Sequence, residues 1–356
     1  MLNNFSMYLY SITILRAIAI ILIVGSHCHS ISNIIPSNFI HRLLINITAG
    51  GTVVFVFLSG FLFHHVFYLK KRINIFLKKR VGRLLIPYLI LSIIPIAYKI
   101  YSQPNFWSSY IHHEETGILN EYIFPIFLFL IGGDHLVAYW YISFAILLFL
   151  CYPLHTMFIK ANYKVQILIL AITLSISLIV QRPPPLSLLS IQSLVYFTPV
   201  YLFGIYCSIY KERIYSFFRA KEYLFLIPFL LILLLQTYFG IEGNAEKFYF
   251  SYEGIDSILP QKIFLCLFLI VWLHRFEGSS NKYVLLLANT SFAIYFLHGY
   301  VLRLLYIIKG HLEIEQFSQP ILVFFISLIV LLLISTLIAI VIKRVFKNNS
   351  SYITGY

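Results

Sequence analysis

Long apolar segments recur from one end of the chain to the other, and they restrict its fold more than any other feature. Ten of them approach the roughly 20 residues that an α-helix needs to cross a bilayer. They are predicted near 8–29, 49–69, 83–101, 137–159, 164–181, 190–209, 222–240, 259–275, 284–307 and 320–342. A shorter apolar stretch, Tyr122 to Ile131, contains Pro125 and is either re-entrant or interfacial. We therefore expect an all-α, polytopic bundle of about ten transmembrane helices.

The rest of the composition leaves little room for a soluble domain. Only 11% of the 356 residues are charged, against about 25% in a typical soluble protein. The net charge of +13 lies in the loops between apolar segments, and no basic helix stands apart from them, which argues against nucleic-acid binding. The apolar run at 7–30 is too long for the core of a cleaved signal peptide. We expect one integral membrane domain over residues 1–356.

Lysines and arginines predict the orientation. If the N-terminus is cytoplasmic, every inside loop is basic and every outside loop is poor in base. The inside loops then hold Lys70, Lys71, Arg72, Lys78, Lys79, Arg80, Arg83, Lys160, Lys164, Lys211, Arg213, Arg219, Lys221, Arg275, Lys282, Lys343, Arg344 and Lys347. The outside loops hold Arg42, Arg182, Lys247, Lys262 and Lys309, with Arg303 near a helix end, and they contain most of the acidic residues. Both termini are therefore predicted to be cytoplasmic.

Cysteine and histidine spacing indicates no metal site. The four cysteines, Cys28, Cys151, Cys207 and Cys266, lie in or at the ends of apolar segments without CxxC spacing, which is typical of small buried side chains. The 12 histidines include no HExxH motif. We expect neither a bound metal nor a permanently bound cofactor.

Arg16 and His27 lie in the first apolar segment. An arginine inside such a helix is costly and usually functional, although Arg16 is close enough to the cytoplasmic end to reach the headgroups. Eleven residues turn a helix by about 1100°, three turns plus 20°, and advance it about 16 Å. The two side chains therefore share one face at opposite depths, which suits a cation at one end of a long ligand and a base at its reactive end. His29 points nearly the opposite way. An interfacial role of His27 stays open.

Small residues border the second apolar segment. It begins with Gly50 and Gly51 and contains Ser59 and Gly60 near its end. Small residues let transmembrane helices approach closely, so packing explains this pattern as well as a functional role does.

Arg80 and Arg83 end the basic loop before the third segment, with Pro87 one turn further on. The positive-inside rule explains the basic run as a whole. Two arginines three residues apart at the mouth of a helix can also bind phosphate groups through paired N–H donors.

Taken in order, these motifs resemble acyltransferase family 3, the membrane O-acyltransferases of bacterial surface glycans. The resemblance rests on six motifs over nearly the whole chain: Arg16 with His27, Gly50 to Phe61, Arg80 to Pro87, Trp140–Ser143 through Pro153, Leu202–Gly204, and Ser291–His298. Six motifs in order are far more specific than any one of them.

The resemblance implies an enzyme that moves an acyl group, usually acetyl from the co-substrate acetyl-coenzyme A, to a sugar hydroxyl of a glycan or its lipid-linked precursor. It also implies a multi-pass protein of the bacterial cytoplasmic membrane, from the short branch without a fused extracellular domain. The implied site residues are His27 as catalytic base, Arg16, Arg80 and Arg83 as donor contacts, and Ser59, Gly60, Trp140 and His298 as motif positions, the last of unknown role. The anionic end of coenzyme A would meet the basic loop on the cytosolic side.

The chain departs from the family in the fourth segment. Many members carry two glutamates where this chain has Ala145 and Ile146. Any role of those carboxylates is either absent or taken over elsewhere, for example by Asp134 as an orienting acid.

Two other classes of protein stay open. A transporter or flippase of glycan-lipid intermediates shares the number of spans and the intramembrane arginine, but it would show paired repeats of broken helices. A glycan polymerase would have a larger outside loop.

Overall fold

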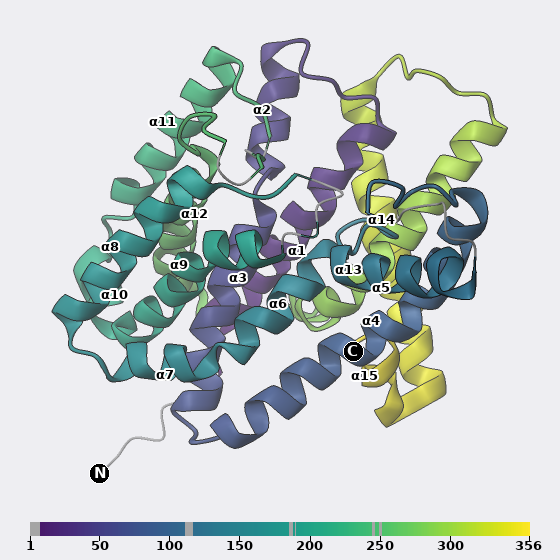
Figure 1. Ribbon diagram of the computed structural model, residues 1–356. Coiled ribbons are helices and arrows are strands. Elements are labelled where there is room, and N and C mark those ends of the chain that lie inside the picture. Colours follow the sequence, from purple (N-terminus) through teal and green to yellow (C-terminus); the bar gives the residue numbers. More distant parts are fainter. Residues whose placement is uncertain (1–7, 111–116, 185–187, 189, 244–245, 249–250) are drawn as a thin grey trace.

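The computed structural model of the protein describes residues 8–110, 117–184, 188, 190–243, 246–248 and 251–356, which form a bundle of helices (Figure 1). Within these residues the only β-type pairing is an isolated bridge between Arg182 and Glu246. The predicted all-α fold is confirmed. The α-helices are α1 (Tyr10–Ile31), α2 (Phe39–Thr48), α3 (Gly51–Leu62), α4 (Ile73–Ser102), α5 (Phe124–Gly132), α6 (Trp140–Leu150), α7 (Tyr152–Lys160), α8 (Tyr163–Val180), α9 (Ser190–Ile209), α10 (Lys211–Phe218), α11 (Tyr223–Phe239), α12 (Ile258–Leu273), α13 (Lys282–His311), α14 (Pro320–Phe346) and α15 (Ser350–Ile353).

Seven helical stretches in the described part of the chain are long and apolar enough to cross a membrane. Two bent pairs, α6 with α7 at 53° and α9 with α10 at 77°, raise the number to nine if each pair is one span. The predicted segment 222–240 corresponds to α11, which has only 17 residues. The structure therefore supports seven to nine spans where the sequence predicts about ten. The seven are Tyr10–Ile31, Phe39–Tyr68, Ile75–Ser102, Tyr163–Val180, Ile258–Phe276, Lys282–His311 and Pro320–Ile353.

Four predicted inside segments lie at one end of the bundle. The backbone N–H of Tyr10 donates to the carboxylate of Glu277 at 2.6 Å, and the N–H of Asn281 donates to the Tyr10 hydroxyl at 2.8 Å. α15 packs on α4, and Gly355 lies beside the carbonyl group of Arg83. In Figure 1, α15 lies at the bottom of the view and α2 at the top. The start of α1 and the last helix thus share one end, and its cytoplasmic location stays a prediction.

α3 and α9 cross with their backbones in contact. A Cβ atom on Gly60 would collide with the carbonyl oxygen of Tyr201, and one on Gly204 would collide with the carbonyl oxygen of Phe57. Two glycines facing each other's helices are what such a close crossing requires. Packing therefore accounts for the motif positions Gly60 and Gly204.

A break inside the second spanning stretch places the N-terminus of α3 in the protein interior. Ala49 and Gly50 separate α2 from α3, and Gly50 has φ of +70°, which glycine adopts without strain. The carbonyl groups of Asn46 and Ile47 accept hydrogen bonds from Lys262 Nζ at 3.3 and 2.9 Å. Lys262 is fully buried in α12, because carbonyl groups freed at membrane depth need an internal donor. The assignment of Lys262 to an outside loop is therefore wrong.

Candidate active site

A cavity of about 340 Å³, here called the inner hollow, lies at the end of the bundle that carries Gly355. Its described lining comes mainly from α1, α3, α4, α6 and α13 and includes Arg16, Lys79, Arg80 and Arg83. No acidic side chain is among these described lining residues. Four cations around one cavity favour an anionic ligand.

The three predicted donor contacts therefore lie around a single cavity. The guanidinium of Arg80 lies 5.1 Å from the ring centre of Phe67 and within electrostatic range of Arg16 and Arg83. Over the described residues, none of these arginines forms an ion pair with a carboxylate. Like charges held close together repel unless an anion such as a phosphate group binds between them. Topology alone would place these bases in a loop, without grouping them around a cavity.

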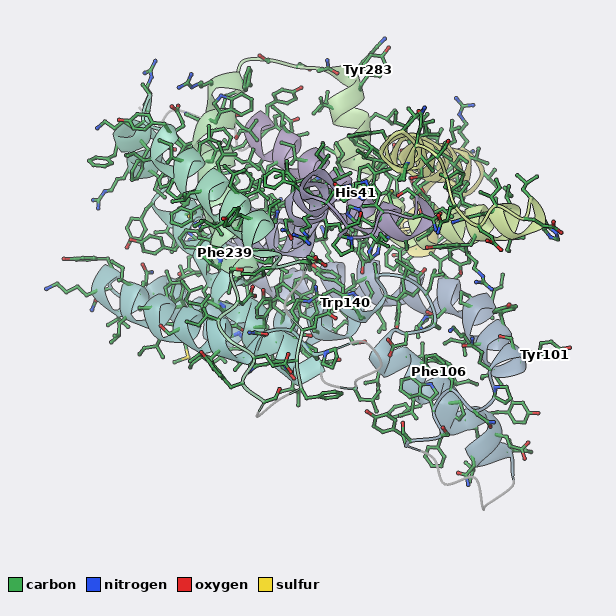
Figure 2. The ribbon with its side chains drawn as sticks, turned by 90° about the horizontal axis from the view of Figure 1, so that it is seen from above. His41, Tyr101, Phe106, Trp140, Phe239 and Tyr283 are labelled. Atoms are coloured by element: carbon green, nitrogen blue, oxygen red, sulfur yellow. The ribbon has the colours of Figure 1, made fainter. Side chains whose placement is uncertain are left out.

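A smaller cavity of about 50 Å³, here called the outer hollow, lies further along α1. One water molecule needs about 10–15 Å³ of such volume, so this cavity holds a group of only a few atoms. Its described lining is Ile23, Ser26, His27, Gly50, Gly51, Thr52, Ala138, Trp140, Tyr141, Arg182 and Tyr295. In the view from above, Trp140 lies near the middle of the bundle, whereas Tyr101 and Tyr283 lie at its edge (Figure 2).

Tyr141 lines both hollows. Its ring centre lies 5.7 Å from that of Phe55, which lines the inner hollow, and 5.4 Å from that of Tyr295, which lines the outer hollow. Aromatic rings thus separate the basic cavity from the cavity that contains His27. A thin ligand reaching from one to the other would displace the side chain of Tyr141.

α1 places Arg16 and His27 at two different cavities, in agreement with their eleven-residue spacing. Arg16 lines the inner hollow and His27 the outer hollow. His29 faces elsewhere: its Nε2 lies 2.7 Å from the Thr48 hydroxyl, and its ring stacks on Phe324 at 5.0 Å. The structure therefore separates His27 from His29 as the sequence does.

His298 lies beside His27. Its ring is fully buried in α13, with its centre 5.5 Å from that of His27. Nδ1 lies 3.0 Å from the carbonyl oxygen of Ile294, so this nitrogen carries the proton and Nε2 is an acceptor. Among the residues that the structure describes, Nε2 has no hydrogen-bond partner. It can accept a ring N–H of His27, which would leave the other nitrogen of His27 free to take a proton.

Arg182 and Tyr141 are residues of the site that the sequence pattern does not single out. Arg182 follows α8 and precedes three prolines, and the pattern indicates only a basic residue of an outside loop. Its guanidinium lies 4.5 Å from the ring centre of Trp140, the predicted motif position at the start of α6. One feature of the sequence could have indicated a functional role for Arg182: it is a basic residue in a predicted outside loop, and such loops are otherwise poor in basic residues. Tyr141 lies next to Trp140 in one of the six motifs.

Asp134 lies apart from the predicted base. It lines a different cavity, of about 720 Å³, together with Lys99, His135 and Arg303. Burial lowers the pKa of His135 to about 4, so this neighbour is neutral at pH 7. The proposed orienting acid therefore faces another cavity, and His298 occupies the position beside His27.

Ser59 lines the inner hollow, where its hydroxyl donates to the carbonyl oxygen of Phe55 at 3.0 Å. This hydrogen bond satisfies the hydroxyl within its own helix, as is common for serine at membrane depth. Ser59 thus borders the predicted donor cavity, whereas its neighbour Gly60 serves the crossing with α9.

Comparison with known proteins adds one match. The family model described as an acyltransferase domain, that of the acyltransferase 3 family, matches residues 9–340. No curated protein and no solved structure matches the chain significantly.

Proposed function

Since the chain belongs to the acyltransferase 3 family and is a membrane acyltransferase, we propose that it carries a short acyl group from acyl-coenzyme A across the membrane to a sugar hydroxyl. Acetyl-coenzyme A is the proposed donor. The proposed acceptor is a bacterial surface glycan or its lipid-linked precursor, reached from the outer side of the cytoplasmic membrane.

The observation that carries this proposal is the pair of hollows on the two sides of Tyr141. The inner hollow offers Arg16, Arg80 and Arg83 to the phosphate groups of coenzyme A. The outer hollow offers His27 to the acceptor hydroxyl. The pantetheine arm is long, thin and flexible, so it can pass the aromatic side chains once Tyr141 moves. The thioester at its tip would then lie beside His27.

The reaction needs one base at the outer hollow. His27 takes the proton of the sugar hydroxyl while the hydroxyl oxygen attacks the carbonyl carbon of the thioester. The C–S bond then breaks, and the thiolate of coenzyme A takes the proton from His27. A positioned histidine commonly contributes about 10²–10⁴-fold to such a reaction near neutral pH. The products are a sugar ester and free coenzyme A.

The size of the outer hollow supports acetyl as the acyl group. A cavity of about 50 Å³ accommodates the three heavy atoms of acetyl more readily than a long chain. In competition, acetyl-coenzyme A should be used in preference to hexanoyl-coenzyme A. Equal use of both would leave acyl transfer in place but remove the support for acetyl.

Proteoliposomes test the proposed transfer directly. Radiolabelled acetyl-coenzyme A is enclosed in the vesicles, and surface polysaccharide isolated from a host strain lacking the gene is added outside. We expect labelled polysaccharide outside and free coenzyme A inside. Label that leaves the vesicles without ester formation would indicate a transporter instead. Mass spectrometry of the polysaccharide would identify the sugar and the hydroxyl.

Two histidine variants sharpen this test. His27→Asn keeps a hydrogen-bonding side chain but cannot take a proton at neutral pH, so it should abolish labelling at normal protein abundance. His29→Asn is the matched control, because His29 lies two residues away and faces Thr48 and Phe324. Substantial labelling by His27→Asn would show that His27 is not the base.

A further inference from the structure

Arg182 is a cation in the outer hollow to which the proposed proton transfer gives no role. Its side chain is only 12% exposed, and it lines the same cavity as His27. It also lies within electrostatic range of His27. A largely buried cation next to a proposed base needs a reason, because desolvating a charge is costly.

The surroundings of Arg182 hold its guanidinium in place. One face stacks on Trp140, whose own ring stacks on Phe144 at 5.7 Å and Phe197 at 6.2 Å between ring centres. One terminal nitrogen lies 3.3 Å from the carboxylate of Glu246. The Nε atom is buried, and among the described residues it has no hydrogen-bond partner. Leaving a buried N–H unpaired is unfavourable, and a ligand oxygen would supply the missing acceptor.

The same cavity is electropositive from a second side. Gly51 and Thr52 begin α3 and line the outer hollow. Their backbone N–H groups belong to the first turn, which has no partner within the helix and carries a partial positive charge. A guanidinium and a helix N-terminus around about 50 Å³ favour one negatively charged oxygen.

Acyl transfer produces such an oxygen. When a hydroxyl attacks a thioester, the new C–O bond forms and the carbonyl electrons move onto the carbonyl oxygen. When the C–S bond breaks, those electrons return and the thiolate leaves. Preorganised donors aimed at that oxygen usually provide the largest single stabilisation of the transition state.

We propose that Arg182 is a second catalytic residue, which stabilises the oxyanion of the tetrahedral intermediate while His27 holds the proton. This inference rests on the proposed acyl transfer. Trp140 is then a positioning residue that fixes the plane of the guanidinium. Glu246 pairs with the terminal nitrogen and leaves the Nε edge to the substrate.

The first test is the kinetics of Arg182→Gln with acetyl-coenzyme A and the isolated polysaccharide. Removing one oxyanion donor should lower kcat about 10²–10³-fold and leave both KM values nearly unchanged, since neither ground state carries the charge. Full kcat would overturn the inference. A raised KM for polysaccharide at normal kcat would also overturn it, because Arg182 would then bind the acceptor.

The second test uses the electronics of the donor. In fluoroacetyl-coenzyme A the fluorine withdraws electrons and stabilises the oxyanion by itself. The deficit of Arg182→Gln relative to the wild type should therefore shrink at least several-fold with this donor. A deficit of the same size with both donors would indicate that Arg182 acts only through the structure.

A third test restores the missing group. Added guanidinium chloride at millimolar concentration should partly restore transfer by Arg182→Ala, which leaves space beside Trp140, and should not restore His27→Asn. Arg182→Lys keeps the charge without the planar fork and should lie between the wild type and Arg182→Gln. Loss of transfer in Arg182→Ala without any rescue, in a folded protein, would contradict a chemical role of the guanidinium.

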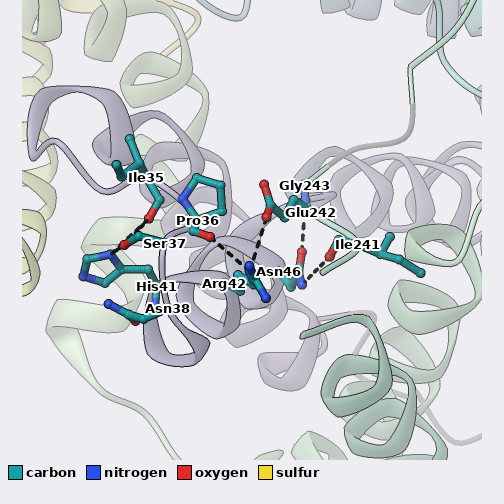
Figure 3. Close-up of polar contacts among 10 residues, drawn as sticks. All are labelled: Ile35, Pro36, Ser37, Asn38, His41, Arg42, Asn46, Ile241, Glu242 and Gly243. Atoms are coloured by element: carbon teal, nitrogen blue, oxygen red, sulfur yellow. Dashed lines mark hydrogen bonds and ion pairs between the residues drawn. The ribbon is translucent and has the colours of Figure 1, made fainter. Parts of the chain in front are cut away.

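Arg42 provides a matched control on the same side of the bundle. Like Arg182, it pairs with a glutamate: its Nε lies 3.4 Å from Glu242 and donates to the carbonyl oxygen of Pro36 at 3.0 Å (Figure 3). It does not line the outer hollow. Arg42→Gln should retain transfer with either donor.

The outcomes separate the two proposals. If the wild type releases coenzyme A but labels no polysaccharide or other hydroxyl acceptor, the proposed function fails and this inference fails with it. If the wild type transfers acetyl and Arg182→Gln does so at full kcat, only the inference fails.

Discussion

At the scale of single residues, His298 is important because one nitrogen of its buried ring has no hydrogen-bond partner among the described residues. Its Nδ1 is committed to the carbonyl oxygen of Ile294, and its Nε2 is buried without a described partner beside His27. A neutral acceptor at this place can select the tautomer of His27, much as an orienting carboxylate does in other acyl-transfer sites. A histidine in this position also offers a reason why the chain can lack the two glutamates of the fourth segment.

His298→Ala should lower kcat at least tenfold, because His27 loses the group that selects its tautomer. KM for acetyl-coenzyme A should stay unchanged, since the inner hollow is untouched. His298→Gln keeps an acceptor oxygen and should recover part of kcat, which a purely structural role would not predict. Steady-state kinetics of both variants check this, and a normal kcat in His298→Ala would contradict it.

The arginines of the inner hollow are expected to act on donor binding. Arg80→Ala and Arg83→Ala should each raise KM for acetyl-coenzyme A about 10–100-fold, since each loses a charge-assisted contact of about 1.5–3 kcal/mol. Lysine at either position should rescue only in part, because it lacks the planar fork. Lys78→Ala is the control, as Lys78 belongs to the same basic segment but does not line the cavity. Unchanged donor kinetics in both arginine variants would reduce these residues to topology signals.

At the scale of elements, the crossing of α3 and α9 holds both hollows together. α3 contributes its first residues to the outer hollow and its last turns to the inner hollow. The position of α3 is set by Gly60 and Gly204 against α9 and by Lys262 at the break after α2. Small shifts of α3 would therefore move the walls of both cavities at once.

Gly60→Ala should destabilise the protein, because the added Cβ collides with a backbone carbonyl group that cannot rotate away. Overpacking of this kind typically costs about 1–3 kcal/mol. The melting temperature in detergent and the folded yield should both fall. Gly310→Ala is the control: Gly310 also lies in a helix, a Cβ atom there would meet no described atom within 4 Å, and alanine should be neutral or slightly stabilising. Equal behaviour of the two variants would contradict the close crossing.

At the scale of the whole molecule, the segments that the charge pattern assigns to one side of the membrane also lie at one end of the folded bundle. The basic start of α4, the loop after α12 and the last helix lie at one end, next to the inner hollow. The proposed transfer from a cytosolic anionic donor to an outer acceptor requires this arrangement, in which the basic cavity and His27 lie at different depths along α1.

Labelling at the two ends of α4 tests this orientation. In a background without the four native cysteines, Ile75→Cys and Tyr101→Cys place thiols at side chains that are 36% and 87% exposed. A membrane-impermeant maleimide added to intact cells should label the Tyr101→Cys variant only. The Ile75→Cys variant should react after the membrane is permeabilised. Efficient labelling of the Ile75→Cys variant in intact cells would reverse the topology.

The sequence by itself determined the helical class and most of the spans, and it predicts the orientation of the chain in the membrane. Helices in a bilayer satisfy their own backbone groups, so length and hydropathy are enough to locate them. The shared face of Arg16 and His27 also followed from the sequence, because the rotation per residue of a single helix is constant. The six ordered motifs likewise indicated the family that the domain match established.

Only the tertiary structure decided which distant segments meet. It brought Arg182 from a loop to Trp140 and His27, placed His298 beside the proposed base, and located Asp134 at another cavity. It also buried Lys262 against the backbone break between α2 and α3, and the hydropathy of the sequence does not indicate that break. These contacts join elements far apart in the chain, and they depend on how helices cross and where backbones approach. The periodicity of a single helix does not predict where two helices cross. The residues that complete the outer hollow are therefore identified only from the packed bundle.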